Sequence, residues 1–492
     1  MGKRIYFNAF HMNCVVHQSP GLWVRPDDKM HKYTDLGTWV ELAKLLERGK
    51  FDALFLADVV GVYDVYRGNR EAAVTQAAQI PVNDPVLLIP TMAYATEHLG
   101  FAFTSSVLQH HPFTFARMIS TLDHLTKGRI AWNIVTSYLE SAGRNFGHPG
   151  LAQHDERYEI ADEYLEVCYK LWEASWEDGA VIKDRQRGIY ADPAKVWDIH
   201  HQGRYFKVHG CHLSEPSPQR TPVLYQAGAS PRGRQFAARH AECVFVLGSN
   251  PHVVGQYIQD TRDKARQQGR NPEDLLFLAY VKVITGDTEA AARRKYDEFF
   301  EQISYDGGLA LLSGWTGIDF GQFAPEQPLE YIETNAIRTI VHGFTEADPS
   351  RKWTLRDLAK YVGIGGAGPV LVGTPEQLAD IFQEWVQAGV DGFNLAYAIT
   401  PDTFADFVEG VVPVLQQRGL MQKDYQEGTL REKLFGRGRA RLSEPHPAAQ
   451  YRRSGADTVN MRALNAHSVK KAGESVGPAQ SPMPNVMGGS CD

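Results

Sequence analysis

Short apolar segments alternate along the chain with longer stretches whose apolar positions recur every three or four residues. The short segments are rich in β-branched and aromatic residues, which favour strands, whereas the longer periodicity is typical of amphipathic helices. Their alternation indicates βαβ units around a parallel sheet. The predicted strands cover residues 4–9, 53–57, 100–105, 129–136, 222–226, 243–247, 276–285 and 392–396.

Helical patterns follow these strands. They cover residues 36–48, 85–98, 113–124, 155–176, 231–240, 252–268, 288–303, 375–388 and 401–418. Eight strand–helix units predict an α/β fold, a closed (βα)8 TIM barrel, whose chemistry lies at the carboxyl ends of the strands. Three connections are too long to be turns, which predicts long insertions after strands 2, 4 and 7. These are residues 59–84, 178–221 and 301–372, and a helical pattern at 354–361 in the last could form a lid.

The composition separates a body, residues 1–436, from a tail, residues 437–492. The tail carries eight Lys and Arg, four Asp and Glu, one aromatic residue and many Pro, Gly, Ser and Ala. Such a segment buries too little apolar surface to offset its ordering entropy. We therefore predict one barrel domain over residues 1–436 and a disordered tail over residues 437–492.

The whole chain has 51 Lys and Arg against 58 Asp and Glu, a net charge of −7, and 43% apolar residues. This balance argues against a nucleic-acid-binding protein. No apolar run reaches the roughly 20 residues of a membrane-spanning helix, and no secretory signal begins the chain. Five scattered cysteines without a CxxC pair argue against a disulfide framework or a zinc site. We expect a cytoplasmic protein that binds neither nucleic acid nor membrane.

Polar side chains occur where three neighbouring predicted strands end. Asp58 follows the second strand, Thr104 lies near the end of the third, and Asn133, Thr136 and Ser137 lie at the end of the fourth. Such side chains donate and accept hydrogen bonds where a barrel opens to a ligand, which suits a flat heterocycle with amide-like edges. Taken singly, each could equally be a cap or an ordinary strand end.

Two predicted helix starts offer binding sites for an anion. His154 and Tyr158 are four residues apart and would share one face of a helix that opens at residue 155. After the fifth strand, Gly228 permits close backbone approach, Ser230 is placed as an N-cap and Pro231 as the first helical residue. Free backbone N–H groups there could bind a phosphate, although His154 could equally be an exposed cap.

Two motifs resemble known cofactor or metal sites but are interpreted otherwise. Residues 363–368 match the dinucleotide-binding pattern GxGxxG, but they follow a helical pattern and open no helix, so we predict a flexible loop. Paired histidines occur at 110–111 and 200–201. Adjacent histidines splay apart and no carboxylate spacing accompanies them, so we predict no metal site.

Taken together, the motifs resemble the bacterial-luciferase-like flavin monooxygenases, within the group of nitrilotriacetate monooxygenase component A, dibenzothiophene-sulfone, EDTA and dimethyl-sulfide monooxygenases. The resemblance covers nearly the whole body, from about residue 7 to residue 434, and none of the tail. The matching stretches are 47–52, 55–58, 96–100, 120–124, 128–137, 142–147, 154–163, 226–233 and 412–419.

This resemblance implies a two-component enzyme that uses reduced FMN, with O2 as the co-substrate. A separate flavin reductase would supply the reduced FMN, and NADH would bind only that partner. The residues implied to contact FMN, or to lie close to it, are Asp58, Thr104, Asn133, Thr136, Ser137, His154, Tyr158, Gly228 and Ser230. No residue is assigned a catalytic role. We also expect a homo-oligomer.

The substrate is predicted from three segments, 11–23, 64–66 and 82–85, which look most like the dimethyl-sulfide branch of the group. A polycarboxylate would need a cluster of cations, and the loop after the first strand carries none beyond Arg25. A small organosulfur compound such as an alkyl sulfide is therefore the first expectation and an aminopolycarboxylate the second. Three other functions stay open as alternatives: a flavin-binding barrel without turnover, a deazaflavin enzyme, and a Schiff-base aldolase that uses Lys282.

Overall fold

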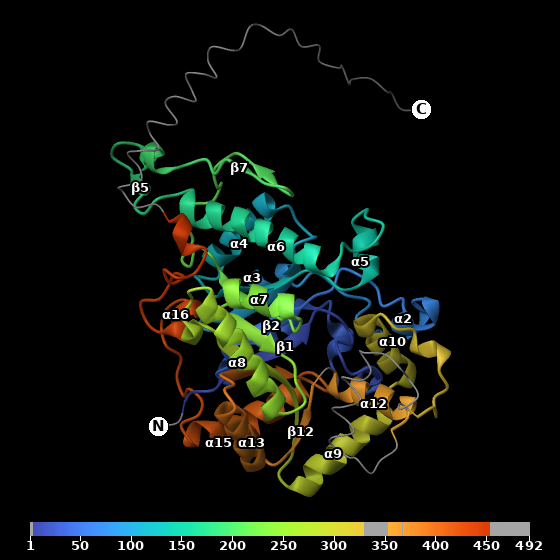
Figure 1. Ribbon diagram of the computed structural model, residues 1–492. Coiled ribbons are helices and arrows are strands. Elements are labelled where there is room, and N and C mark those ends of the chain that lie inside the picture. The colour runs from blue at the N-terminus through green and yellow to red at the C-terminus, as the bar shows by residue number, and fades with distance from the viewer. Residues whose placement is uncertain (1–2, 329–352, 367, 453–492) are drawn as a thin grey trace, which may run out of the picture.

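The computed structural model describes residues 3–328, 353–366 and 368–452 (Figure 1). Parallel strands form a closed ring, because β10 pairs with β11 as well as with β9. The predicted (βα)8 barrel is confirmed, and each of the eight predicted strands is present. In chain order they are β1 (Tyr6–Met12), β2 (Ala53–Ala57), β3 (Gly100–Ser106), β4 (Ile130–Val135), β9 (Val223–Gln226), β10 (Cys243–Val246), β11 (Leu276–Thr285) and β13 (Gly392–Ala396).

Helices cover the outside of the barrel, where outward-facing strand residues meet them; Phe7 of β1, for example, packs 5.4 Å from Phe382 between ring centroids. Among the described helices, none is long and apolar enough to cross a membrane. The helices are α1 (Leu36–Arg48), α3 (Ile89–Tyr94), α4 (Pro112–Leu125), α6 (His154–Tyr169), α7 (Pro231–His240), α8 (Pro251–Gln267), α9 (Glu289–Gln302), α13 (Pro375–Gln387), α14 (Asp402–Asp406) and α15 (Val412–Gln417).

Two helices predicted as continuous are interrupted by a π-helical turn. The turn Lys170–Ala174 follows α6, and the turn Phe407–Val411 separates α14 from α15. Side-chain periodicity does not reveal such turns, because the apolar face stays nearly continuous through them.

Inward-facing side chains fill the barrel. Phe10 lies 5.0 Å from Phe245, 5.4 Å from Phe55 and 5.9 Å from Tyr280 between ring centroids. All four side chains are buried and belong to one apolar cluster. The barrel is therefore a packed core, and a ligand has to bind at its rim.

The long insertions occur after β2, β4 and β11, as predicted, and they contain structure of their own. The insertion after β11 has α10 (Tyr305–Thr316), α12 (Leu355–Gly365) and β12 (Val370–Gly373), which extends the sheet beside β11. The predicted flexible loop is wrong at 363–365, which form the last turn of α12, and residue 367 lies outside the described residues. The other insertions contain α2 (Glu71–Thr75), α5 (Glu140–Asn145), β5 (Val181–Asp184), β6 (Ile189–Ala191), β7 (His201–Gln202) and β8 (Lys207–Val208).

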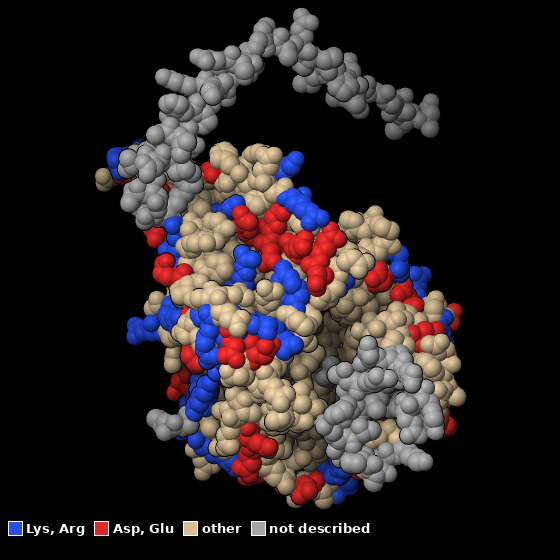
Figure 2. Space-filling model, viewed as in Figure 1, with Lys and Arg blue, Asp and Glu red and all other residues tan. Residues whose placement is uncertain are grey.

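The insertions after β2 and β11 pack against each other. Tyr63 and Tyr66 share an apolar cluster with Leu309, Leu312 and Leu358. In Figure 2 the molecule is hollowed between the face that carries α7 and α8 and the side that carries α10 and α12. The two insertions therefore form one wall beside the barrel mouth.

The predicted disorder is wrong for residues 437–452. Leu442, His446 and Ala448 are buried there. Arg439 and Arg441 lie 2.7 Å from carboxylate oxygens of Asp274 and Asp178. The arginines that made this segment look like a solvated tail are thus paired with acids from distant parts of the chain. The rest of the predicted tail, 453–492, lies outside the described residues.

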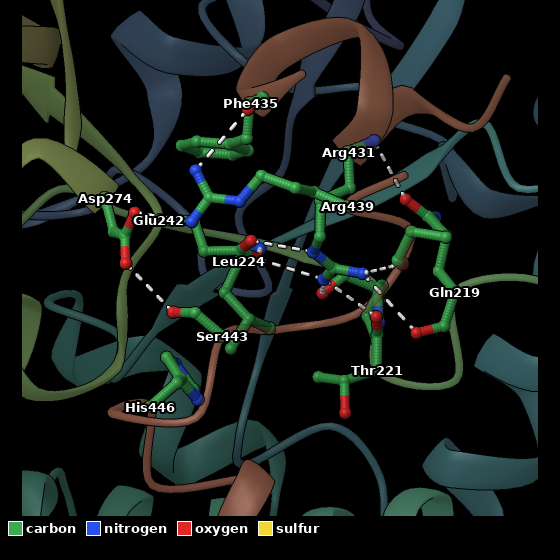
Figure 3. Close-up of polar contacts among 12 residues, drawn as sticks. Gln219, Thr221, Leu224, Glu242, Asp274, Arg431, Phe435, Arg439, Ser443 and His446 are labelled. Atoms are coloured by element: carbon green, nitrogen blue, oxygen red, sulfur yellow. Dashed lines mark hydrogen bonds and ion pairs between the residues drawn. The ribbon is translucent and has the colours of Figure 1, made fainter. Parts of the chain in front are cut away.

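Arg431 of α16 (Leu430–Phe435) ties this segment to the amino-terminal end of the barrel (Figure 3). Its Nε and Nη2 donate to the two carboxylate oxygens of Glu242, at 2.7 and 3.0 Å. Nη2 also donates to the carbonyls of Thr221 and Pro222, and Nη1 donates to the carbonyl of Ala440. A buried guanidinium with these partners fixes the start of β9 and β10 relative to the end of the chain.

Candidate active site at the carboxyl rim of the barrel

Asp58 follows β2 directly and lines a pocket of about 70 Å³. Gln109 Nε2 donates to Asp58 Oδ2 at 3.2 Å, and Gln109 Oε1 accepts from the Ser106 backbone N–H and from Ser105. Burial raises the pKa of Asp58 to about 7. This carboxyl group can therefore exchange a proton near neutral pH, which an ordinary exposed Asp cannot do.

Thr104 and Asn133 lie side by side on β3 and β4, where their Cα atoms are register partners. Asn133 Nδ2 donates to Thr104 Oγ1 at 2.9 Å. Asn133 Oδ1 is buried and has no hydrogen-bond partner among the described residues. Because a buried acceptor without a partner costs free energy, this oxygen is suited to a ligand N–H group.

Thr136 and Ser137 line two neighbouring cavities. Ser137 adopts a positive φ of 62°, its Oγ lies 2.8 Å from Ser106 Oγ, and it faces the pocket of Asp58. Thr136 lines a cavity of about 240 Å³ together with Arg157. The Nε of Arg157 is buried without a partner among the described residues, so this cavity also has an unused donor.

Ser230 begins α7 as its N-cap, as predicted, and its Oγ accepts from Gly233 N–H at 3.0 Å. Gly228 is held on both sides: its N–H donates to Gln226 Oε1, and its carbonyl accepts from Tyr257 OH, each at 2.8 Å. These two hydrogen bonds fix the backbone at Gly228.

Tyr158 completes this cradle. A Cβ atom added to Gly228 would lie 2.9 Å from Tyr158 OH and 2.7 Å from Gly233 Cα, so only glycine fits there. His154 is the first residue of α6, and its ring lies 5.3 Å from that of Tyr158. However, His154 Nδ1 is 2.6 Å from Asp155 Oδ1, and the side chain is exposed. The structure thus brings His154 next to the cradle but pairs it with an acid.

The two groups of predicted residues lie on one rim. β4 pairs with β9, so that Asn133 is the register partner of Tyr225 and Ile134 that of Gln226. Asn133 therefore lies on the strand adjacent to β9, which leads into Gly228. Thr104 on β3 and Asp58 after β2 follow on the next two strands of the ring. One part of the rim offers hydrogen bonds to a flat polar ring, and the other offers hydroxyl and backbone donors to an anion.

Four residues at this site were missed by the sequence interpretation: Gln109, Arg157, Gln226 and Tyr257. Gln226 and Arg157 stood within motifs that were noted, but their residue types alone do not point to a role. Gln109 and Tyr257 come from other parts of the chain and reach Asp58 and Gly228 only through the fold.

Lys282, the residue required by the aldolase interpretation, does lie inside the barrel. It is fully buried in β11, its Nζ donates to Ser19 Oγ at 2.7 Å, and burial lowers its pKa to about 7. Within the described residues, no group of three or more His, Cys, Asp or Glu side chains could hold a metal ion.

Replacing Asp58 by asparagine should change the free energy of unfolding differently at pH 8 and at pH 5. The change should be about 2 kcal/mol more favourable at pH 8. The folded-state pKa of Asp58 is raised from 3.8 to about 7, so between these values the folded protein holds a proton that the unfolded chain has released. The free energy of unfolding therefore falls as the pH rises from 3.8 to about 7. Asparagine does not titrate, so the variant does not lose this stability. Urea unfolding at both pH values measures the effect.

The matched control is Asp297→Asn, since this carboxylate is exposed on α9. Its effect on the free energy of unfolding should be the same at pH 5 and pH 8. An equal change at the two pH values for Asp58→Asn would show that the Asp58 carboxyl group is not buried in the folded protein.

Two relatives each match 92% of the chain. The "Dimethyl-sulfide monooxygenase" of Hyphomicrobium sulfonivorans is 51% identical over 453 residues, 92% of this chain and 94% of that protein. The "Long-chain alkane monooxygenase" of Geobacillus thermodenitrificans (strain NG80-2) is 53% identical over 453 residues, 92% of this chain and 99% of that protein. Both relatives are named as monooxygenases.

Solved structures agree with this similarity. The crystal structure of DmoA from Hyphomicrobium sulfonivorans superposes with a TM-score of 0.88 at 50% identity, covering 92% of this chain and 98% of that one. The crystal structure of riboflavin lyase (RcaE) with modified FMN and riboflavin gives a TM-score of 0.83 at 36% identity, covering 92% and 100%. The model of the family described as "Luciferase-like monooxygenase" matches residues 12–392. The predicted resemblance is confirmed, and the chain belongs to the luciferase-like monooxygenase family.

Proposed function

We propose that this chain is the oxygenase of a two-component system, which uses O2 and reduced FMN from a separate NADH:FMN reductase to oxygenate a small organosulfur compound such as an alkyl sulfide. The observation that carries the proposal is the pairing, on one rim, of the glycine cradle at Gly228 with the unpartnered acceptor of Asn133. A phosphorylated flavin needs both kinds of site, one for its anionic end and one for its ring.

The residues that would hold FMN divide between these sites. The phosphate would be bound by Ser230, Gly228 and Tyr158, which lie at the N-terminus of α7. His154, whose ring lies 5.3 Å from that of Tyr158, would join them. The residues that would bind the ring are Asp58, Thr104, Asn133, Thr136 and Ser137. When bound, reduced FMN supplies the activation of O2 from which one oxygen atom passes to the substrate. The FMN in the riboflavin lyase structure, a relative at 36% identity, supports this choice of cofactor.

The chain's own contribution is to hold a proton and to exclude water. Asp58 can hold or release a proton at neutral pH, and Gln109 fixes the orientation of its carboxyl group. Val59, Val60 and Leu139 form apolar walls of the same pocket. Apolar walls keep water away from a reactive oxygen donor, so that its oxygen passes to the substrate.

The pocket of Asp58 favours a small, weakly polar substrate. None of the described residues that line it is Lys or Arg, whereas a polycarboxylate would require such partners. A sulfide is therefore a better candidate substrate than an aminopolycarboxylate. An alkane is a second candidate, because the relative at 53% identity is named as an alkane monooxygenase and the pocket walls are largely apolar.

The test is to incubate the chain with chemically reduced FMN, ¹⁸O2 and a panel of dimethyl sulfide, alkanes and nitrilotriacetate, and to analyse products by mass spectrometry. We expect a product of dimethyl sulfide that carries one ¹⁸O atom, and no such product without the chain. Products from nitrilotriacetate alone would overturn the substrate class. The absence of product from every compound would favour the flavin-binding barrel without turnover.

A further inference from the structure

A cavity of about 530 Å³ lies outside the barrel, between α6, α7, the end of α8 and the segment 437–452. Arg232, Gln235 and Arg239 face it from α7, where spacings of three and four residues place side chains on one face. Pro445 and Pro447 border it from the C-terminal segment. In Figure 2, basic side chains with a few acidic ones among them lie over the region where Figure 1 shows α7.

The charges that line this cavity are not balanced. Three guanidinium groups, those of Arg232, Arg239 and Arg270, face one carboxylate, that of Asp162. Asp162 Oδ2 accepts from Arg232 Nη2 at 2.5 Å, and Asp162 Oδ1 lies 3.5 Å from Arg239 Nη1. The same carboxylate is shared with His240 Nε2 at 2.7 Å. Burial lowers the pKa of His240. The lining itself carries three guanidinium groups against one carboxylate, an excess of two positive charges. Glu242 and Asp274 lie on the other side of Arg270, outside this lining.

Arg270 has donors that its protein partners do not use. Arg270 is only 5% exposed. Nη1 donates to the carbonyls of Ala238 and Ala241, at 3.0 and 2.7 Å. Nε and Nη2 donate no hydrogen bond to the described residues, and neither is among the buried donors that lack a partner, so both stay accessible. These N–H groups are therefore free to donate to an oxygen of a ligand.

We propose that this cavity is a second anion-binding site, which binds small molecules that carry phosphate. Guanidinium groups bind the oxygens of a phosphate through paired N–H donors, and the excess charge of two matches that of a phosphate ester. The volume exceeds that of a single phosphate, so there is room for the rest of a ligand beside the amides of Gln235 and Gln268.

This site is distinct from the cradle at the barrel rim. Ser230 caps the beginning of α7, whereas Arg239 and Arg270 lie at its end. The nine steps along the helix from Ser230 to Arg239 span about 13 Å. Arg232 touches both sites, because its guanidinium lies 5.4 Å from the centroid of the Tyr158 ring. Arg239 is therefore the residue to vary, since its side chain is 54% exposed and its ion pair is long.

The test is a calorimetric titration of the full chain with pyrophosphate and with ADP, and with succinate as a dianion without phosphate. We expect saturable binding of pyrophosphate and ADP and none of succinate. Arg239→Gln should weaken binding at least tenfold, and so should Gln235→Glu, which adds a negative charge to the lining. The matched control is Arg293→Gln, an exposed arginine of α9, which should bind as the unchanged chain does.

Ser230→Ala separates this inference from the proposed function. Pyrophosphate binding that survives Ser230→Ala and is weakened by Arg239→Gln supports the second site, whether or not FMN binds at the rim. Binding that is lost in Ser230→Ala and kept in Arg239→Gln would place the anion at the rim and overturn the proposal. No saturable binding, or equal binding of succinate, would overturn it as well.

Discussion

Replacing Arg431 by alanine should lower the free energy of unfolding by about 3–5 kcal/mol. Arg431 is 1% exposed, and its guanidinium makes two hydrogen bonds to Glu242 and further bonds to the carbonyls of Thr221 and Pro222. Alanine leaves the buried Glu242 carboxylate without its hydrogen-bonded cation and these carbonyls without this donor. Urea unfolding at pH 7 measures the loss.

A double variant shows whether the charge is the cause. Arg431→Met combined with Glu242→Gln leaves no buried charge, so it should be more stable than Arg431→Met alone by about 1 kcal/mol or more. Arg293→Ala, an exposed arginine 3.9 Å from Asp297, should change stability by less than about 0.5 kcal/mol. A double variant less stable than the single one would contradict this account of Arg431.

Replacing Gly228 by valine should weaken FMN binding by about 100-fold, which corresponds to about 2.7 kcal/mol. A Cβ at this position would lie 2.7 Å from Gly233 Cα and 2.9 Å from Tyr158 OH, so either the backbone or the tyrosine must move. Either movement changes the cradle that Gly228 and Tyr158 form. Titration followed by flavin fluorescence measures the affinity.

The control for this glycine is Gly210→Ala. A Cβ at Gly210 meets nothing within 4 Å, so this variant should bind FMN as the unchanged chain does. Unfolding of both variants should be measured in parallel, because Gly228→Val is also expected to cost about 1–3 kcal/mol of stability. Unchanged FMN affinity in a folded Gly228→Val protein would mean that the cradle does not bind the flavin.

The barrel could be predicted from sequence because its strands are short, apolar and separated by regular helices. Every strand of the ring is buried between the helices and the interior, and that burial produces the runs of apolar residues. The hairpins β5–β6 and β7–β8 were not predicted, because their strands are only two to four residues long and their exposed residues interrupt the apolar pattern. The segment 437–452 was misread because its order comes from pairing with Asp178 and Asp274, which composition does not reveal.

The candidate site was predictable where its chemistry is local. Ser230 and Gly228 form a turn and an N-cap within a few residues, and Asp58 ends a strand. Gln109 and Tyr257 were not predictable, because each reaches the site from another element. Arg270 could not be recognised either, since its environment combines the end of α7 with the chain terminus.

The binding of reduced flavin tests the central claim most directly. Photoreduced FMN, titrated anaerobically into the chain and followed by absorbance, should bind saturably with one flavin per chain. Riboflavin, which lacks the phosphate, should bind at least about tenfold more weakly, because the cradle of Tyr158, Gly228 and Ser230 has no anion to hold. Absence of saturable binding by FMN in either redox state, or equal affinity for riboflavin, would contradict the account.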